Sequence, residues 1–152
     1  MQIWNEKADL PVGTKYLIEY DYRFNGHGSL RDGATTHALS AMQVLNGGES
    51  SIGYIEAYIN DDPNKTNLCF NNDGATFTTI NAGEWHKICF EIEITETGYT
   101  MGQRLDGVAK KTVTSTNSVA SILGLRAIVN ECASSEHSYD NFVFAVIPPV
   151  AE

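Results

Sequence analysis

Cysteine is scarce, and its spacing carries no known metal or redox signature. Cys69, Cys89 and Cys132 make an odd count with no Cys-x-x-Cys pair, which argues against a zinc site or a thioredoxin-type motif. One disulfide with one free thiol and three buried thiols both remain open. The chain also has no G-x-S-x-G elbow, no phosphate-binding glycine loop and no H-E-x-x-H motif, and its four histidines are scattered.

Basic residues are the second shortage. Ten Lys and Arg stand against nineteen Asp and Glu, which gives a formal net charge of -9. Nucleic-acid phosphates and anionic membrane surfaces both require clustered cations, so neither is expected as a partner. Neutral ligands such as glycans remain open, as do ligands that bind through calcium. Acidity of this kind also serves simply to keep a domain soluble.

Long hydrophobic runs are missing as well. No apolar stretch reaches the roughly 18 residues of a membrane helix, and the polar start MQIWNEKADL does not resemble a signal peptide. The proline-containing end at 148–152 predicts the start of a linker. We expect one domain over 1–152, cut from a larger extracellular or cell-surface protein and acting as a monomer attached to other modules.

The pattern that is present has a period of two. In KYLIEYDYRF (15–24) apolar and polar residues alternate, and EWHKICFEIEIT (84–95) shows the same pattern more strongly. Turn signals such as Asp106-Gly107 separate many short segments of this kind. Besides 15–24 and 84–95, the predicted strands are 37–45, 51–59, 68–70, 75–80, a hairpin within 99–114, 121–130 and 139–147.

These short strands predict an all-β fold. No helical pattern supplies the crossovers that a parallel sheet requires. Strands that recur every 8 to 12 residues or so are typical of a sandwich or a barrel. The sequence therefore predicts an antiparallel two-sheet β-sandwich.

Three motifs carry a resemblance to a known superfamily. They are GTKYLIEYDYRF (13–24), GEWHKICFEIEITETGYTMGQRLDG (83–107) and SYDNFVF (138–144). Together they resemble the concanavalin A-like, or laminin-G-like, jelly-roll superfamily, and the last resembles the closing strand of carbohydrate-binding modules. The resemblance implies a jelly roll and places Trp85 in the core at a strand end. Because the superfamily includes lectins, adhesins, glycanases and lyases, the fold leaves function open.

One strand pattern suggests a sugar-binding surface. Tyr54, Glu56 and Tyr58 alternate along 51–59 and therefore project from one face. Sugar rings pack their C–H faces on aromatic rings, and their hydroxyls bind carboxylates and amides. The alternative is that the two tyrosines cover an edge or a second layer.

Charged residues on two other strands extend this hypothesis. If the 15–24 strand lies beside 51–59, Asp21 and Arg23 could complete a polar groove, although an ordinary solvated face is the simpler interpretation. Arg126 lies in an apolar strand, where it could bind hydroxyls or a uronic carboxylate, or else pair with an acidic residue. Loops around His27 and Asn60 could rim a site.

The closing motif raises the question of calcium. In related modules an acidic residue of this motif helps to hold a structural calcium, which makes Asp140 the candidate metal ligand here, with Asn141 or Glu6 as helpers. Calcium takes roughly six to eight oxygen ligands, and no loop shows dense acidic spacing. We expect no cofactor to be required.

An enzyme is the less favoured alternative. FEIEITE (90–96) resembles the three-carboxylate strand of laminarinase-type glycosidases, and Glu91 and Glu93 share a face. The central acid differs from that family, and the chain is short. We therefore predict a non-catalytic carbohydrate-binding module that binds polysaccharide. The alternatives are a structural or attachment domain, such as an adhesin or phage surface module, and a small glycanase or lyase.

Overall fold

Two antiparallel sheets make up the fold. The computed structural model describes residues 2–4, 11–34, 37–46, 51–71, 77–117, 124–130 and 132–149. Sheet A has the strand order β1-β10-β3-β4-β5-β6, and sheet B has the order β11-β2-β7-β8-β9. Sheet A consists of β1 (Gln2–Trp4), β10 (Gly124–Val129), β3 (Ala38–Leu45), β4 (Ser51–Ile59), β5 (Lys65–Phe70) and β6 (Phe77–Asn81). Sheet B consists of β11 (Ser135–Ile147), β2 (Lys15–His27), β7 (Trp85–Thr95), β8 (Gly98–Leu105) and β9 (Val108–Ser115).

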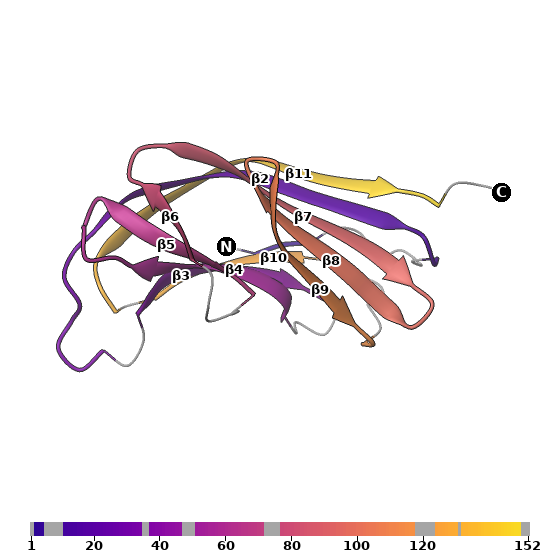
Figure 1. Ribbon diagram of the computed structural model, residues 1–152, viewed down its shortest axis with the longest axis horizontal. Helices are drawn as coiled ribbons and strands as arrows, with labels where there is room; N and C mark the ends of the chain where they lie inside the picture. Colours follow the sequence, from indigo (N-terminus) through magenta and orange to yellow (C-terminus); the bar gives the residue numbers. More distant parts are fainter. Residues whose placement is uncertain are drawn as a thin grey trace.

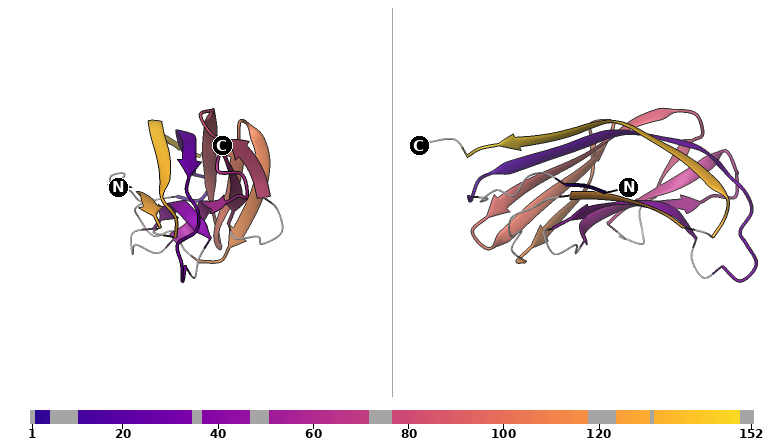
Figure 2. Two further views of the ribbon diagram at one scale, coloured as in Figure 1. Left: turned by 90° about the vertical axis from the view of Figure 1, so that its left-hand side faces the viewer. Right: turned by 180° about the vertical axis from the view of Figure 1, so that it is seen from behind.

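The sheets stack face to face as a sandwich. Sheet B, with its long strands β2 and β11, arches over sheet A (Figure 1). Seen from behind, β11 and β2 run side by side along the molecule above β10 and β3 (Figure 2). This arrangement confirms the predicted two-sheet jelly roll. No helix in the described part of the chain is long and apolar enough to cross a membrane.

The core lies between the sheets and follows the alternation of the sequence. In β2 every second side chain from Tyr16 to Phe24 is buried, and the apolar series of β7 from Ile88 to Ile94 lies beside it on the same inward face of sheet B. Sheet A supplies its own inward set, including Leu39, Met42 and Leu68. Because a strand sends successive side chains to opposite faces, the remaining residues of each strand form the two outward faces of the sandwich.

Tight turns set the register of the hairpins. Asp106 and Gly107 both have positive φ, at 50° and 79°, as a two-residue type I′ turn between β8 and β9 requires. The Asp106 carboxylate accepts hydrogen bonds from the Lys87 backbone amide and from His86 Nδ1, each at 2.8 Å. The predicted hairpin over 99–114, with its turn at 106–107, is therefore confirmed.

The closing strand contains a bulge. The pairing of β11 with β2 shifts between Asp140 and Val143, and Asn141 has a φ of 51°. The extra residue turns Phe142 inward, where its ring lies 5.7 Å from that of Tyr20. The outward Asn141 amide donates to Asp21 Oδ2 at 2.6 Å. The middle of the SYDNFVF motif therefore forms the bulge of β11.

Several expectations are corrected by the structure. The 15–24 strand does not lie beside 51–59, because β2 pairs with β11 and β7 in the other sheet. Trp85 is 46% exposed on the outward side of β7, so its predicted core position is wrong. All three cysteines are free and buried, which selects between the two states that the sequence left open.

Candidate functional site

The outward side of sheet A gathers aromatic and polar side chains from five neighbouring strands. Residues of β10, β3, β4, β5 and β6 align in cross-strand rows, which the register fixes: Arg126 pairs with Gln43, and Gln43 pairs with Tyr54. Further along β4, Tyr58 pairs with Asn67, which in turn pairs with Thr79. We call this surface the sheet A face and define it by Gln43, Tyr54, Glu56, Tyr58, Asn67, Phe77, Thr79 and Arg126.

The predicted triplet occupies the middle of this face. Tyr54 and Tyr58 are separated by four residues, or ~13 Å along an extended strand, so together they span more than one sugar ring. The Tyr58 hydroxyl donates to Glu56 Oε2 at 2.8 Å. Burial, followed by this hydrogen bond and the charge of Glu56, raises the pKa of Tyr58 well above the ordinary value for a phenol. The Tyr58 phenol is therefore protonated at neutral pH.

Arg126 lies at the β10 side of the same face. Its Nε and Nη2 both donate to Gln43 Oε1, at 3.0 and 2.6 Å. This contact fixes the Gln43 amide, because a carbonyl oxygen held by two donors leaves the NH₂ end facing away from the guanidinium. The acidic partner that was one alternative for Arg126 is not found among the described residues, and a glutamine takes that place.

Four residues of the face were not among the predicted site residues: Gln43, Asn67, Phe77 and Thr79. Phe77 is 48% exposed on β6, and its ring meets that of Tyr58 edge to face, with 5.5 Å between the centroids. Asn67 accepts hydrogen bonds from Asn60 and Thr79. Gln43 carried a usable signal, since it is the one polar residue of its size in the apolar segment ALSAMQVL.

Two hollows lie beside the face, at the loops around His27. One has a volume of about 250 Å³ and is lined by His27, Gly28 and residues 59–61 with Pro63. The other, of about 290 Å³, lies between residues 25–28 and 134–136. His27 lines both hollows. Its Nδ1 lies 2.7 Å from the Gly28 carbonyl oxygen, and its Nε2 lies 3.4 Å from the backbone nitrogen of Asn60. Of the predicted loop residues, His27, Asn60 and Asp61 come together here.

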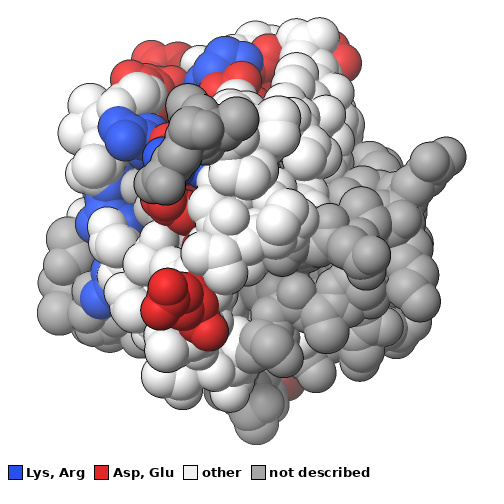
Figure 3. All heavy atoms as spheres, turned by 90° about the vertical axis from the view of Figure 1, so that its right-hand side faces the viewer, with Lys and Arg blue, Asp and Glu red and all other residues white. Residues whose placement is uncertain are grey.

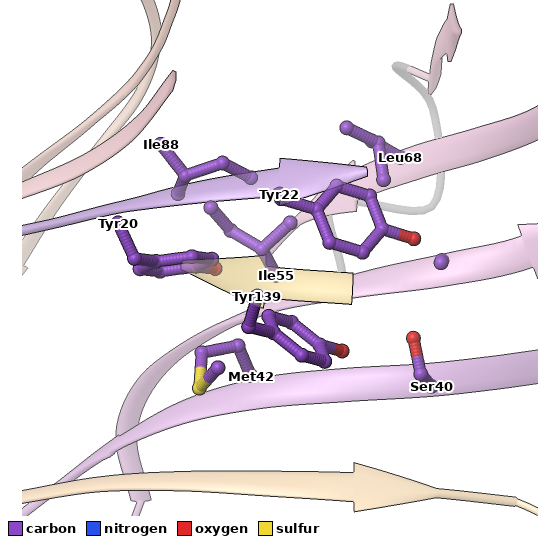
Figure 4. Close-up of a pocket in the computed structure, with 9 residues that line it drawn as sticks. Tyr20, Tyr22, Ser40, Met42, Ile55, Leu68, Ile88 and Tyr139 are labelled. Carbon is purple, nitrogen blue, oxygen red and sulfur yellow. The ribbon is translucent and has the colours of Figure 1, made fainter. Parts of the chain in front are cut away.

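A small cavity inside the sandwich belongs to the core. It measures about 10 Å³ and is lined mainly by apolar side chains, which leaves room for roughly one water molecule. The hydroxyls of Tyr22, Tyr139 and Ser40 lie along one side of it (Figure 4). His137 borders this polar group, with Nδ1 3.0 Å from the Tyr22 hydroxyl. Burial lowers the pKa of His137 to about 4, so the imidazole is neutral in the folded protein at neutral pH.

The other two predicted ligand residues lie on the opposite side of the molecule. Asp21 and Arg23 project outward from β2 in sheet B, and no single site can include them with Tyr54. Asp21 accepts from Asn141 and from Lys87, and these two hydrogen bonds lower its pKa. Charges of both signs lie close together on the end of the sandwich shown in Figure 3, with basic side chains along the left rim and acidic ones beside and above them.

The predicted calcium ligand stands alone in the described part of the chain. Asp140 is exposed, and its carboxylate accepts from the backbone amide of Asn141 at 2.7 Å. No three His, Cys, Asp or Glu side chains converge among the described residues, whereas calcium takes roughly six to eight oxygens. Glu6, the other carboxylate considered, lies outside the described residues. Calcium at Asp140 stays a prediction.

The carboxylates considered for catalysis lie on the outward side of sheet B. Glu91 and Glu93 alternate with the buried isoleucines of β7, as the sequence suggested. Glu93 forms an ion pair with Lys15 at 3.4 Å, and Glu91 stands opposite Leu17 and Gly102. The two carboxylates therefore share one outward face, and one of them is paired with a lysine.

Comparisons with known proteins identify the architecture. No protein-family model and no curated protein matches the sequence. Among solved structures, the Emp47p carbohydrate recognition domain superposes with a TM-score of 0.52 at 11% identity, over 97% of this chain and 77% of that one. An alginate lyase from Klebsiella pneumoniae gives 0.52 at 13% identity, over 89% and 60%. A sialidase gives 0.53 at 10% identity, over 95% of this chain and 15% of that one.

These likenesses establish a concanavalin A-like sandwich and nothing more specific. At such low identities only the fold is shared, and the chain spans little more than half of the lyase. The proteins with this fold include a carbohydrate recognition domain as well as enzymes.

Proposed function

From the concanavalin A-like fold and the sheet A face together, we propose that this chain is a non-catalytic carbohydrate-binding module that binds a neutral polysaccharide. The observation that carries the proposal is the cross-strand alignment of Tyr54, Glu56 and Tyr58 with Gln43 and Arg126 on one outward face. The aromatic rings offer surfaces for sugar C–H groups, and the carboxylate and amide between them bind hydroxyls.

The charge of the face favours neutral sugars. Glu56 is bound by the Tyr58 phenol, a neutral donor, so its negative charge remains at the centre of the platform. A uronic acid placed over the Glu56 carboxylate would be repelled. A sugar hydroxyl, in contrast, can donate a hydrogen bond to the lone pairs that the Tyr58 hydroxyl leaves unoccupied. An open face of this kind binds weakly, with dissociation constants on the order of micromolar to millimolar, or about -8 to -4 kcal/mol.

The same residues support a non-catalytic role. Glycoside hydrolysis generally uses two carboxyl groups that flank the bond, and Glu56 is the single carboxylate in the set that defines the sheet A face. A lyase needs a base of suitable pKa, and the pKa of Tyr58 is raised. We also propose that the module works outside the cell as a monomer joined to other modules, with no cofactor.

The decisive experiment is affinity gel electrophoresis against soluble neutral polysaccharides from plant, algal and host sources, with calcium and with a chelator. The wild-type protein should be retarded by at least one polymer class. The double variant Tyr54→Ala/Tyr58→Ala should lose at least ten-fold in affinity, because both stacking surfaces are removed while the inward half of β4 is unchanged.

A matched double variant controls for general effects. Thr112 and Thr114 are exposed on edge strand β9 of sheet B, so Thr112→Ala/Thr114→Ala should bind as the wild type does. Circular dichroism melting of each variant reports folding. Retained affinity in the tyrosine double variant would overturn the site. Absence of retardation on every polymer, together with a stable symmetric oligomer, would favour an attachment domain instead.

A further inference from the structure

An exposed tryptophan stands on the outward side of sheet B, opposite the sheet A face. Trp85 opens β7, projects outward in register with Arg23, and is 46% exposed. A single exposed apolar residue is ordinary in a soluble protein. Trp85 is unusual because of the cation placed on it: the guanidinium carbon of Arg23 lies 4.7 Å from the ring centroid. The guanidinium is stacked on the indole, and we call the two groups together the Trp85–Arg23 platform.

The cation on this platform has no counter-charge. Among the described residues Arg23 makes no ion pair, and its Nε is buried without a hydrogen-bond partner. Arg126 also lacks a carboxylate partner, but two of its donors bind Gln43, whereas no described residue accepts a hydrogen bond from Arg23. The indole holds the guanidinium through a cation–π contact, worth about 0.5–1 kcal/mol at an exposed site. That contact uses no N–H donor, so the two Nη groups of Arg23, unlike the buried Nε, remain available to a ligand.

The acidic residue two positions from Arg23 on the outward side of β2 is already occupied. Asp21, two residues along β2, accepts from Lys87 at 2.9 Å and from Asn141 at 2.6 Å. On the other side of Arg23, the Asn25 amide donates to Ser138 Oγ at 2.9 Å. Because Asp21 is already bound by two donors, it does not compete for the guanidinium.

We propose that the Trp85–Arg23 platform is a second binding site, which takes a sugar unit that carries a carboxylate. The C–H groups of the pyranose ring would pack on the part of the indole that stays exposed beside Arg23, and the carboxylate would accept hydrogen bonds from the guanidinium. Arginine presents planar paired donors that match a carboxylate, and a charge-assisted pair of this kind is roughly twice as strong as a neutral hydrogen bond. The site is independent of the sheet A face, because the two lie on opposite outer sides of the sandwich.

The net charge of -9 opposes the approach of an acidic polymer but does not forbid contact. At physiological ionic strength, charges farther apart than about 8 Å are largely screened. The local pair of Arg23 with the ligand carboxylate therefore outweighs distant acidic residues at that salt concentration. At low salt the repulsion extends farther, and binding should weaken.

The test uses a uronic acid polymer and its carboxyl-reduced form, which is neutral and otherwise identical. We expect the Tyr54→Ala/Tyr58→Ala variant, in which the sheet A face is disabled, to bind the uronic polymer at least ten-fold more tightly than the reduced form in affinity electrophoresis at physiological salt. Ligand should also change the tryptophan fluorescence, and Trp85→Phe should remove that change. Arg23→Gln should abolish the preference for the carboxylate, because it removes the charge and the paired donors.

Arg104→Gln is the matched control, since it makes the same change on an exposed arginine of β8 in the same sheet. It should keep the preference, and Arg23→Lys should keep only part of it. Equal binding of the two polymers, no binding of the uronic polymer, or an unchanged preference in Arg23→Gln would each overturn the proposal. Neutral polysaccharide run on the same gels reports the sheet A face separately, so failure of one site is distinguishable from failure of the other.

Discussion

The two outward faces of the sandwich arise from the same alternation of side chains, yet they differ in which charge is left without a partner. On the sheet A face, Arg126 is bound to a glutamine and Glu56 to a phenol, and the carboxylate stands at the centre. On sheet B, Asp21 is satisfied by Lys87 and Asn141, while Arg23 rests on Trp85 with no carboxylate beside it. The uncompensated charge, rather than the count of charged residues, sets the ligand chemistry expected of each face.

The largest expected effect is a loss of folding stability in acid, which removes both faces together. His137 is neutral in the folded protein, because burial lowers its pKa to about 4 from an ordinary 6.5. The unfolded chain binds this proton below pH 6.5 and the folded chain does not until about pH 4, so stability is lost as the pH falls through that window. The loss should be about 1.4 kcal/mol per pH unit, or about 3 kcal/mol in total.

Denaturant unfolding at several pH values measures this loss, and His137→Phe should show a flatter dependence in the same window. If that variant does not fold, NMR titration of His137 in the wild-type protein provides the check. A pKa near the ordinary value would contradict the prediction.

The next effect should make the two faces more alike. Glu56→Gln removes the negative charge from the sheet A face and keeps the size and hydrogen-bonding capacity of the side chain. We expect the affinity of this face for a uronic polymer, which the Glu56 charge repels in the unmodified protein, to rise about ten-fold. That gain equals about 1.4 kcal/mol. Affinity electrophoresis in the Arg23→Gln background isolates this face. An unchanged uronic affinity would mean that Glu56 does not set the charge preference.

A smaller effect concerns how Arg126 acts on the sheet A face. Its guanidinium holds the Gln43 oxygen through two hydrogen bonds, so we expect it to position the amide for the ligand. Arg126→Ala and Gln43→Ala should each lower neutral-polysaccharide affinity, and the double variant should lose no more than the larger single loss. The coupling in this double-mutant cycle should be about 1 kcal/mol. Additive losses would show that Arg126 contacts the sugar directly.

The smallest expected effect concerns Lys87 and Asp21, which lie on the same side of sheet B as the Trp85–Arg23 platform. Lys87→Met removes one of the two hydrogen bonds to Asp21, so the pKa of the Asp21 carboxyl should rise toward its ordinary value while the Asn141 hydrogen bond keeps it lowered. NMR titration of Asp21 measures this shift. The pair is exposed and screened, so the melting temperature should scarcely change. No movement of the Asp21 pKa would show that Asn141 alone holds the carboxylate.

Much of the fold was predictable, because alternation is a local property. The segment 15–24 shows by its sequence that Tyr16 and Phe24 share a buried face, and the Asp-Gly pair at 106–107 specifies its turn. The short strand β1 was missed, since three residues contain too little pattern to detect. Trp85 was misplaced because the family resemblance implied a core position at a strand end, whereas its position in the alternation of β7 puts it outside.

The candidate site was only partly predictable for a different reason. Tyr54, Glu56 and Tyr58 share one strand, so the period of two joins them without further information. Arg126 and Gln43 reach the same face only because β10 and β3 pair with β4 in sequence-distant ladders. Phe77 and Asn67 depend on the β5–β6 hairpin in the same way.

The sequence alone therefore determined the all-β class, the inward and outward halves of each strand and the acidic character of the protein, because these follow from neighbouring residues and composition. Only the tertiary structure decided which outward halves lie side by side. The order of strands in a sheet depends on pairings between distant segments, and it placed Asp21 and Arg23 with Trp85 rather than with Tyr54. That separation gives the protein two chemically distinct faces.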